Sequence, residues 1–286
     1  MNRFEKANRV GLLGIGANLF LFCIKIGVGL ISRSQGMIAD ALNSASDIVS
    51  SLMTFIGNKI AGKPEDSGHP YGHGKAEYIF SMFISITMLT VAAAIFKNSV
   101  KSIINKEVLY FSWWIVVVCV VTIVVKALLY VYTSKIGKED NNLLVLANAQ
   151  DHRNDVFVTL STLCGVIASL FGLFWLDGAV GIGISIWIFY SGVQILLASF
   201  KVLMDSDEDN IALKQEIRDY VTSVQKVGHI DSITAKPVGV NYLIVLKISV
   251  DGNMTVSDSH QLAGELRYNL RKNKRIADVV IHINPL

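Results

Sequence analysis

Long runs of hydrophobic residues dominate the first 204 positions of the chain, and short polar segments separate them. A helix needs about 20 apolar residues to cross a bilayer, and six of these runs are long enough. We expect the membrane-spanning helices at residues 10–31, 37–61, 77–100, 112–134, 142–173 and 177–203. The pattern therefore predicts an α-helical membrane protein with six transmembrane helices.

Polar residues interrupt two of these predicted helices at helical spacing. The second contains Asn43 and Asp47, and the fifth contains Asp151 and Asp155. Residues at positions i and i+4 share one face of a helix. A charge at membrane depth costs about 2.5–3.5 kcal/mol on insertion scales, so such groups usually face a bundle interior and mark an ion or proton path. The alternative is that these acids only solvate a cytosolic helix.

The two polar pairs are expected to lie at similar depth. At about 1.5 Å per residue, Asp47 lies ~15 Å from the outer end of its helix, while Asp151 and Asp155 lie ~14 Å and ~20 Å from the inner end of theirs. These positions are near the middle of a hydrocarbon core about 30 Å thick. Together with Asn43, the three carboxylates can close around one divalent cation.

Other polar residues in the predicted bundle have open roles. Asp40 shares the polar face of the second helix and either lines an exit path or is interfacial. His152 is about 100° around the helix from its acidic neighbour, which favours a packed histidine over a ligand. Lys25 and Lys126 lie inside apolar runs, and the sequence leaves open whether they snorkel or pair.

The loop at residues 62–77 contains a carboxylate and two imidazoles close together, at Asp66, His69 and His73. Imidazole with carboxylate suits zinc and related first-row divalent ions. Polar turns often contain histidine, so the spacing leaves a metal site and an ordinary loop equally open. The loop is rich in Gly and Pro and lacks H-E-x-x-H, which argues against a metalloprotease helix.

From Asp205 onward the sequence has the pattern of a soluble domain. Helical spacing and strand-like alternation predict the order αββαβ, a compact sheet with helices on one face, from segments at 210–225, 230–235, 242–250, 256–272 and 278–283. We therefore divide the chain into a transmembrane domain at 1–204 and a cytosolic α+β domain at 205–286. The scattered histidines of this domain do not by themselves predict a site.

Composition agrees with a membrane protein, because 52% of the residues are hydrophobic and only 17% are charged, whereas soluble domains carry about 25%. The net charge of +3 is too small to suggest nucleic acid, and the basic run at 271–275 is typical of a solvated helix end. The three cysteines stand alone without a CxxC pair, so neither structural zinc nor a disulfide is indicated. No nucleophile or catalytic dyad accompanies the acids, and we expect neither an enzyme nor a resident cofactor.

Basic residues predict how the helices are oriented. Lysine and arginine are frequent before the first helix and in the second and fourth loops, while the short first loop carries only Arg33. The positive-inside rule then places both termini in the cytosol of a protein in the cell membrane. The lysines at 97–106 run against this rule.

The chain resembles the cation diffusion facilitators along nearly its whole length. The resemblance rests on three motifs, which are Asn43-x-x-x-Asp47, Asp151-x-x-x-Asp155 and His69-Pro-Tyr-Gly-His73-Gly-Lys75-Ala-Glu77. It implies six transmembrane helices followed by a metallochaperone-like domain. It also implies a homodimer in the lipid bilayer that exports divalent metal from the cytosol, usually in exchange for protons.

The resemblance also assigns site residues. It implies a transport site at Asn43, Asp47, Asp151 and Asp155, and a second site near the cytosolic face at Asp66, His69 and His73. In the cytosolic domain it implies metal binding across the dimer interface at Asp231, His260, His282 and Asn284, where Asp and Asn depart from the histidine-richer zinc pattern. Lys75 and Asp205 correspond to an inter-subunit charge pair.

The transport site of this sequence offers only oxygen ligands. Zinc-transporting relatives carry His at the position of Asp151, whereas oxygen suits harder ions such as Mn²⁺. Mg²⁺ dehydrates reluctantly, which argues against it. We expect Mn²⁺ efflux in exchange for protons. Export of Zn²⁺, Fe²⁺ or Cd²⁺, a metal-gated channel, and a membrane-tethered sensor or assembly protein that does not transport remain as alternatives.

Overall fold

The computed structural model describes residues 3–31, 35–105, 113–169, 171, 175–206, 211–239 and 241–286. The chain forms two compact units. The first contains Met1–Gly62 and Ala76–Phe200, and the second contains Lys63–Lys75 and Lys201–Leu286. The loop with the two histidines therefore belongs to the same unit as the C-terminal domain.

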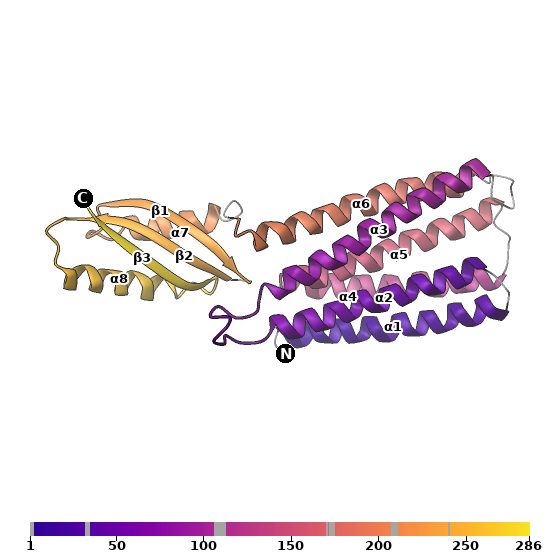
Figure 1. Cartoon of the computed structure of the whole chain (residues 1–286), viewed down its shortest axis with the longest axis horizontal. Helices are drawn as coiled ribbons and strands as arrows, with labels where there is room; N and C mark the ends of the chain where they lie inside the picture. Colours follow the sequence, from indigo (N-terminus) through magenta and orange to yellow (C-terminus); the bar gives the residue numbers. More distant parts are fainter. Residues whose placement is uncertain are drawn as a thin grey trace. The chain divides into compact units, whose positions relative to one another are not determined.

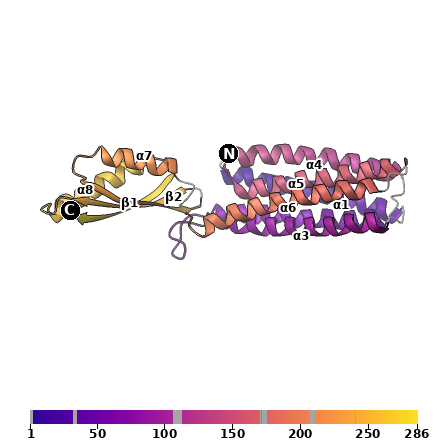
Figure 2. The same ribbon diagram turned by 90° about the horizontal axis from the view of Figure 1, so that it is seen from above.

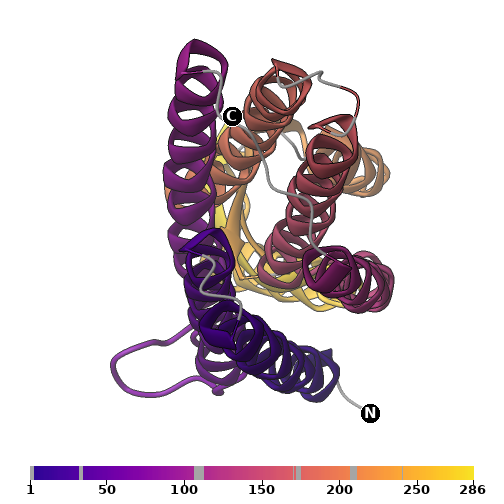
Figure 3. The ribbon, with the colours of Figure 1, turned by 90° about the vertical axis from the view of Figure 1, so that its right-hand side faces the viewer.

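The first unit is built from six long helices, which Figures 1 and 3 show from the side and along their length. They are α1 (Arg3–Ile31), α2 (Gln35–Ala61), α3 (Ala76–Asn105), α4 (Trp113–Glu139), α5 (Leu143–Ser169) and α6 (Trp175–Leu203). The prediction of six helices is confirmed, but several ends were wrong. The first helix begins at Arg3 rather than at residue 10, because helix formation continues into the charged segment that the hydrophobic pattern excludes. The predicted end of the fifth helix at residue 173 lies outside the described residues.

The helices differ in how apolar they are. Within the described residues, α1, α3, α4 and the part of α6 from Gly178 are long and apolar enough to cross a membrane. Helices α2 and α5 do not meet that threshold, because they carry the polar pairs. The two helices contact each other. Their polar side chains are therefore turned largely toward other helices rather than toward lipid.

Helices α1 and α2 approach closely where α1 has glycine. A Cβ atom added at Gly11 would lie 2.9 Å from the Cα of Phe55, and one added at Gly14 would lie 2.7 Å from the Oγ of Ser51. Small residues at a helix interface let two backbones approach in this way. The polar face of α2 thus lies directly against α1.

The second unit contains α7 (Ile211–Thr222), β1 (His229–Val238), β2 (Asn241–Val250), α8 (Val256–Leu270) and β3 (Ile276–Pro285). The order αββαβ is confirmed, and the strands extend beyond the predicted segments. The sheet order is β1-β2-β3, with β1 antiparallel and β3 parallel to β2.

Helices α7 and α8 lie on one side of the sheet (Figure 2), and the sheet face toward them carries the hydrophobic core of the unit. Ile244, Leu246 and Ile248 alternate along β2 and are fully buried with the leucines of α7 and α8. Because successive residues of a strand point to opposite faces, both helices pack on the same side of the sheet. This agrees with the predicted arrangement.

Candidate functional site

A strip of buried polar residues follows one face of α2. Its members recur every three or four residues, at Ser44, Asp47, Ser51, Thr54 and Asn58. This spacing places them on a single side of the helix.

Amides of the neighbouring helices bind this strip. The Nδ2 of Asn18 on α1 donates to the Oγ of Ser51 at 3.1 Å, and the Nδ2 of Asn148 on α5 donates to the Oγ1 of Thr54 at 2.7 Å. A polar seam therefore lies between α1, α2 and α5. Burial without such bonds would be costly for each of these groups.

Lys126 of α4 joins the polar faces of α2 and α5. Its Nζ lies 2.7 Å from the Oδ2 of Asp47 and 2.5 Å from the Oδ2 of Asp155, and its side chain is 1% exposed. One buried ammonium group thus bridges two of the predicted ligands. The sequence left the pairing of this lysine open, and the structure assigns it to the carboxylates of the candidate site.

The other predicted intramembrane ligands lie beside this cluster. Asp151 is one turn from Asp155 and interacts electrostatically with Asp47, Asp155 and Lys126. Its Oδ2 is buried and has no hydrogen-bond donor among the described residues. Asn43 is one turn from Asp47 on α2 and is half-buried. The structure therefore brings the predicted carboxylates into one region of the bundle.

The second buried lysine belongs to a different contact. The Nζ of Lys25 donates to the Oγ of Ser44 at 3.0 Å and forms an ion pair with Asp40, whose Oδ2 is also 3.0 Å away. Asp40 is therefore a partner of Lys25 in this structure. His152 is 1% exposed, and a Cβ added at Gly14 would lie 3.7 Å from its Nε2, so it packs toward α1.

The loop residues Asp66, His69 and His73 come together as potential metal ligands. One ligand atom from each lies within 4.8 Å of the others, and they are the one such trio of His, Cys, Asp or Glu found in the described parts of the chain. Asp47, Asp151 and Asp155 do not meet this distance. The sequence left a metal site and an ordinary polar loop equally open here. The structure brings the three side chains together as a compact group.

Hydrogen bonds in the loop orient these ligands. The Nδ1 of His73 lies 3.2 Å from the carbonyl oxygen of Pro64, which can only accept, so Nδ1 carries the proton. The other ring nitrogen, Nε2, lies 3.4 Å from the Oδ2 of Asp66. A metal-bound histidine commonly donates its other ring N–H in this way.

The carboxylate of Asp66 is held by the backbone of the same turn. It accepts from the N–H of His69 at 2.7 Å and from the N–H of Gly68 at 2.9 Å. The backbone bond from His69, the largest effect, lowers the pKa of the exposed Asp66 carboxyl below its ordinary value. The group is thus kept in the anionic form that binds cations.

The loop is also packed against the C-terminal domain within its unit. A Cβ added at Gly74 would lie 2.8 Å from the Cα of Gly239, which has a φ of +80°. The Nζ of Lys75 lies 2.6 Å from the Oδ1 of Asp205. This ion pair, which the resemblance implies between subunits, is formed here within one chain.

The candidates of the C-terminal domain are not gathered in the same way. Asp231 accepts from the Nδ2 of Asn284 at 2.8 Å and from the Oγ of Ser249 at 2.9 Å. The bond from Asn284 and then that from Ser249 lower the pKa of Asp231. Within the described part of one chain, Asp231, His260 and His282 form no compact group of ligand atoms.

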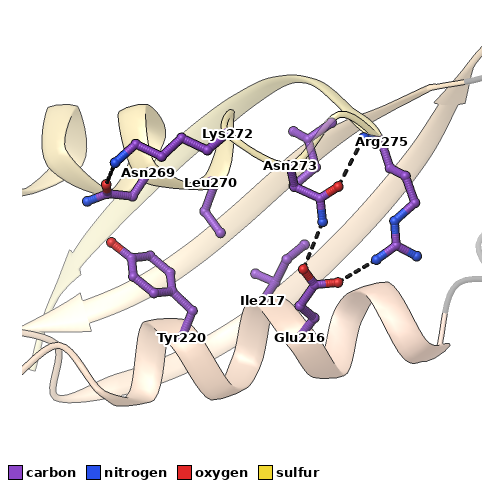
Figure 4. Close-up of a pocket in the computed structure, with 9 residues that line it drawn as sticks. Glu216, Ile217, Tyr220, Asn269, Leu270, Lys272, Asn273 and Arg275 are labelled. Atoms are coloured by element: carbon purple, nitrogen blue, oxygen red, sulfur yellow. Dashed lines mark hydrogen bonds and ion pairs between the residues drawn. The ribbon is translucent and has the colours of Figure 1, made fainter.

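A pocket between α7 and the end of α8 contains part of the basic run at 271–275 (Figure 4). Glu216 accepts from the Nδ2 of Asn273 at 2.9 Å and forms an ion pair with Arg275. The Nζ of Lys272 donates to the Oδ1 of Asn269 at 2.8 Å. These residues are engaged in contacts within their own domain.

The chain matches two family models. Residues 11–204 match the cation efflux transmembrane domain, and residues 212–286 match the cytoplasmic domain of cation efflux proteins. The manganese efflux system protein MneP of Bacillus subtilis is 29% identical over 292 residues, which cover 99% of this chain and 97% of the relative.

Two further relatives are similar over most of the chain. An uncharacterised transporter of Methanocaldococcus jannaschii is 30% identical over 273 residues, which cover 96% of both proteins. The magnetosome protein MamM of Paramagnetospirillum magneticum is 29% identical over 255 residues, which cover 88% of this chain and 80% of the relative.

Proposed function

The chain belongs to the cation efflux family of multi-pass membrane transporters, and from this membership we propose that it exports Mn²⁺ from the cytosol in exchange for protons. It is a transporter rather than an enzyme. The observation that carries the proposal is the convergence of Asp47, Asp151 and Asp155 inside the helical bundle.

The chemistry of these residues supports manganese as the cargo. Carboxylates, with the amide oxygen of Asn43, offer only oxygen, which suits Mn²⁺ better than the tetrahedral nitrogen-containing sites that zinc prefers. Two relatives from Bacillus subtilis, MneP and MneS, are manganese efflux system proteins. Both the ligand type and the similarity therefore support Mn²⁺ as the substrate.

Proton exchange is supported by the same carboxylates. Ligands must be deprotonated to hold a metal, so protons and Mn²⁺ compete for them. In the proposed cycle, Mn²⁺ enters the site from the cytosol and the bundle then opens to the outside. Protons that arrive there neutralise the acids and release the metal.

The second unit supplies the other parts of the proposal. Asp66, His69 and His73 form a metal site near the cytosolic face, and the C-terminal domain joins two copies of the chain into a homodimer with both termini in the cytosol. The compact geometry of the loop trio and the match to the cytoplasmic domain of the family support these assignments. The spread of Asp231, His260 and His282 in one chain means that a third site would need ligands from both copies.

The test is metal uptake into proteoliposomes under a proton gradient, with Mn²⁺ and Zn²⁺ side by side, for the wild type and Asp151→His. We expect the wild type to prefer Mn²⁺ and the variant to gain Zn²⁺ transport, because histidine adds the nitrogen ligand that zinc prefers. Equal transport of both ions by the wild type would contradict the selectivity. If neither ion moves, the protein is a metal-binding sensor or assembly factor instead.

A further inference from the structure

The charge of Lys126 is placed where the proposed cargo would bind. Its ammonium lies 2.7 Å from Asp47 and 2.5 Å from Asp155, and it is buried between α2, α4 and α5. Asp47, Asp151 and Asp155 do not form a trio of ligand atoms within 4.8 Å of one another, as the loop residues do. Lys126 is the cation that the oxygens of Asp47 and Asp155 bind in this structure.

A metal ion and this ammonium group cannot use the same oxygens together. Hard divalent cations bind carboxylate oxygen at about 2.0–2.6 Å. An ion at that distance from both Oδ2 atoms, which lie 2.7 Å and 2.5 Å from Nζ, would be close to the ammonium group and would be repelled by its charge. Metal binding at these atoms therefore competes with Lys126.

We propose that Lys126 is a tethered monovalent competitor that sets the charge a cation must carry to enter the transport site. This inference rests on the proposed function, since it concerns the same site. Na⁺ or K⁺ carries the same charge as the ammonium group and gains no Coulomb advantage over it. A divalent cation carries twice that charge and displaces the lysine.

The tether makes this competition effective. An attached group is present at an effective concentration that free ions match only in the millimolar range or above, and it loses little translational freedom when it binds. Burial strengthens the discrimination, because the energy between charges rises as the effective dielectric constant falls. Lys126 would thus exclude abundant monovalent ions at the cost of weaker binding of the divalent cargo.

Lys25 provides a matched control. It is also a buried lysine in the bundle, 3% exposed, and it also contacts a carboxylate of α2. Its partners are Asp40 and Ser44 rather than Asp47 and Asp155. Loss of a buried positive charge is therefore common to variants of both lysines, while direct competition at the site belongs to Lys126 alone.

The experiment measures the Kd for Mn²⁺ by calorimetry on the purified full-length protein. The loop site is removed in every sample by His69→Ala and His73→Ala. In this background we compare the unchanged lysines with Lys126→Met, Lys126→Gln and Lys25→Met. Each protein is measured in sodium chloride and in N-methyl-D-glucamine chloride of equal ionic strength, so that screening is the same.

We expect both Lys126 variants to bind Mn²⁺ at least about tenfold more tightly than the parent in N-methyl-D-glucamine. Sodium should weaken binding to these variants severalfold and should leave the parent and Lys25→Met unchanged. Gln keeps an N–H donor without the charge, so it replaces Met in the comparison if the Met variant does not fold.

Several outcomes would overturn the inference. Unchanged or weaker Mn²⁺ binding by the Lys126 variants would show that the lysine is a structural contact or assists the metal. Sodium sensitivity of the parent protein would also contradict the proposal, and this arm needs no lysine variant. If no protein in the series binds Mn²⁺, the proposed function itself fails, whereas binding by the parent without a gain in the variants rejects only the role of Lys126.

Discussion

Glu77 is a buried acid to which two other parts of the bundle are attached. Its Oε2 lies 2.7 Å from the Nη2 of Arg3, and its Oε1 accepts from the N–H of Leu143 at 2.7 Å. Leu143 is the first residue of α5, and its N–H has no partner within its own helix. One side chain at the start of α3 therefore stabilises the ends of α1 and α5.

We predict that Glu77→Ala lowers the free energy of unfolding by about 3–5 kcal/mol, because it leaves a guanidinium group without its buried partner. Thermal or denaturant unfolding of the purified protein measures this change. Glu139→Ala is the control, since Glu139 is exposed and 4.0 Å from Lys135, a pair of about 0.3–0.5 kcal/mol. Equal losses of unfolding free energy in the two variants would show that Glu77 contributes no more to stability than an exposed surface ion pair.

At the scale of elements, the contact between α1 and α2 depends on the absence of side chains at particular positions. Gly11 faces the backbone of Phe55, whereas Gly16 on the same helix has nothing within 4 Å of an added Cβ. The two glycines lie in one helix but on different surfaces. Substitutions at these two positions therefore distinguish the effect of helix propensity on stability from the effect of packing between helices.

We predict that Gly11→Ala destabilises the bundle, because a methyl group 2.9 Å from the Cα of Phe55 forces the helices apart. Overpacking of this kind typically costs about 1–3 kcal/mol. Gly16→Ala should be neutral or stabilising, since alanine favours the helix by up to about 1 kcal/mol. The melting temperatures of the two variants test this, and a Gly11→Ala variant as stable as Gly16→Ala would contradict the close packing.

At the scale of the whole molecule, the C-terminal sheet is covered by helices on one face only. Strand β3 presents Val280 and His282 on the side away from the core, and Val280 is 48% exposed. The family match of this domain is independent of that of the helical bundle. Both observations are consistent with the proposed role of the domain in joining two chains.

We predict that removal of residues 205–286 lowers the fraction of dimer, because the transmembrane part then loses the domain that is proposed to hold the two copies together. Light scattering coupled to size-exclusion chromatography, in the same detergent for the full-length and shortened proteins, measures the mass of each. A shortened chain that stays fully dimeric at the same concentration would place the main interface in the bundle.

The sequence by itself determined the features that depend on local spacing. Six apolar runs and the order αββαβ follow from periodicity, because the buried face of a helix or strand produces a regular spacing of apolar residues within a short stretch of sequence. The pairing of Asp151 with Asp155 along one face needs only the pitch of a helix. The loop trio was visible for the same reason, since Asp66, His69 and His73 are near neighbours in the chain.

Only the tertiary structure decided which distant residues meet. Lys126 is 79 residues from Asp47 and 29 from Asp155, and its pairing with both depends on how α2, α4 and α5 are rotated against one another. Glu77 likewise reaches α5 across 66 residues. Helix rotation results from the packing of all the side chains between helices and has no local signature, so a charge inside an apolar run could be noticed in the sequence but not assigned a partner.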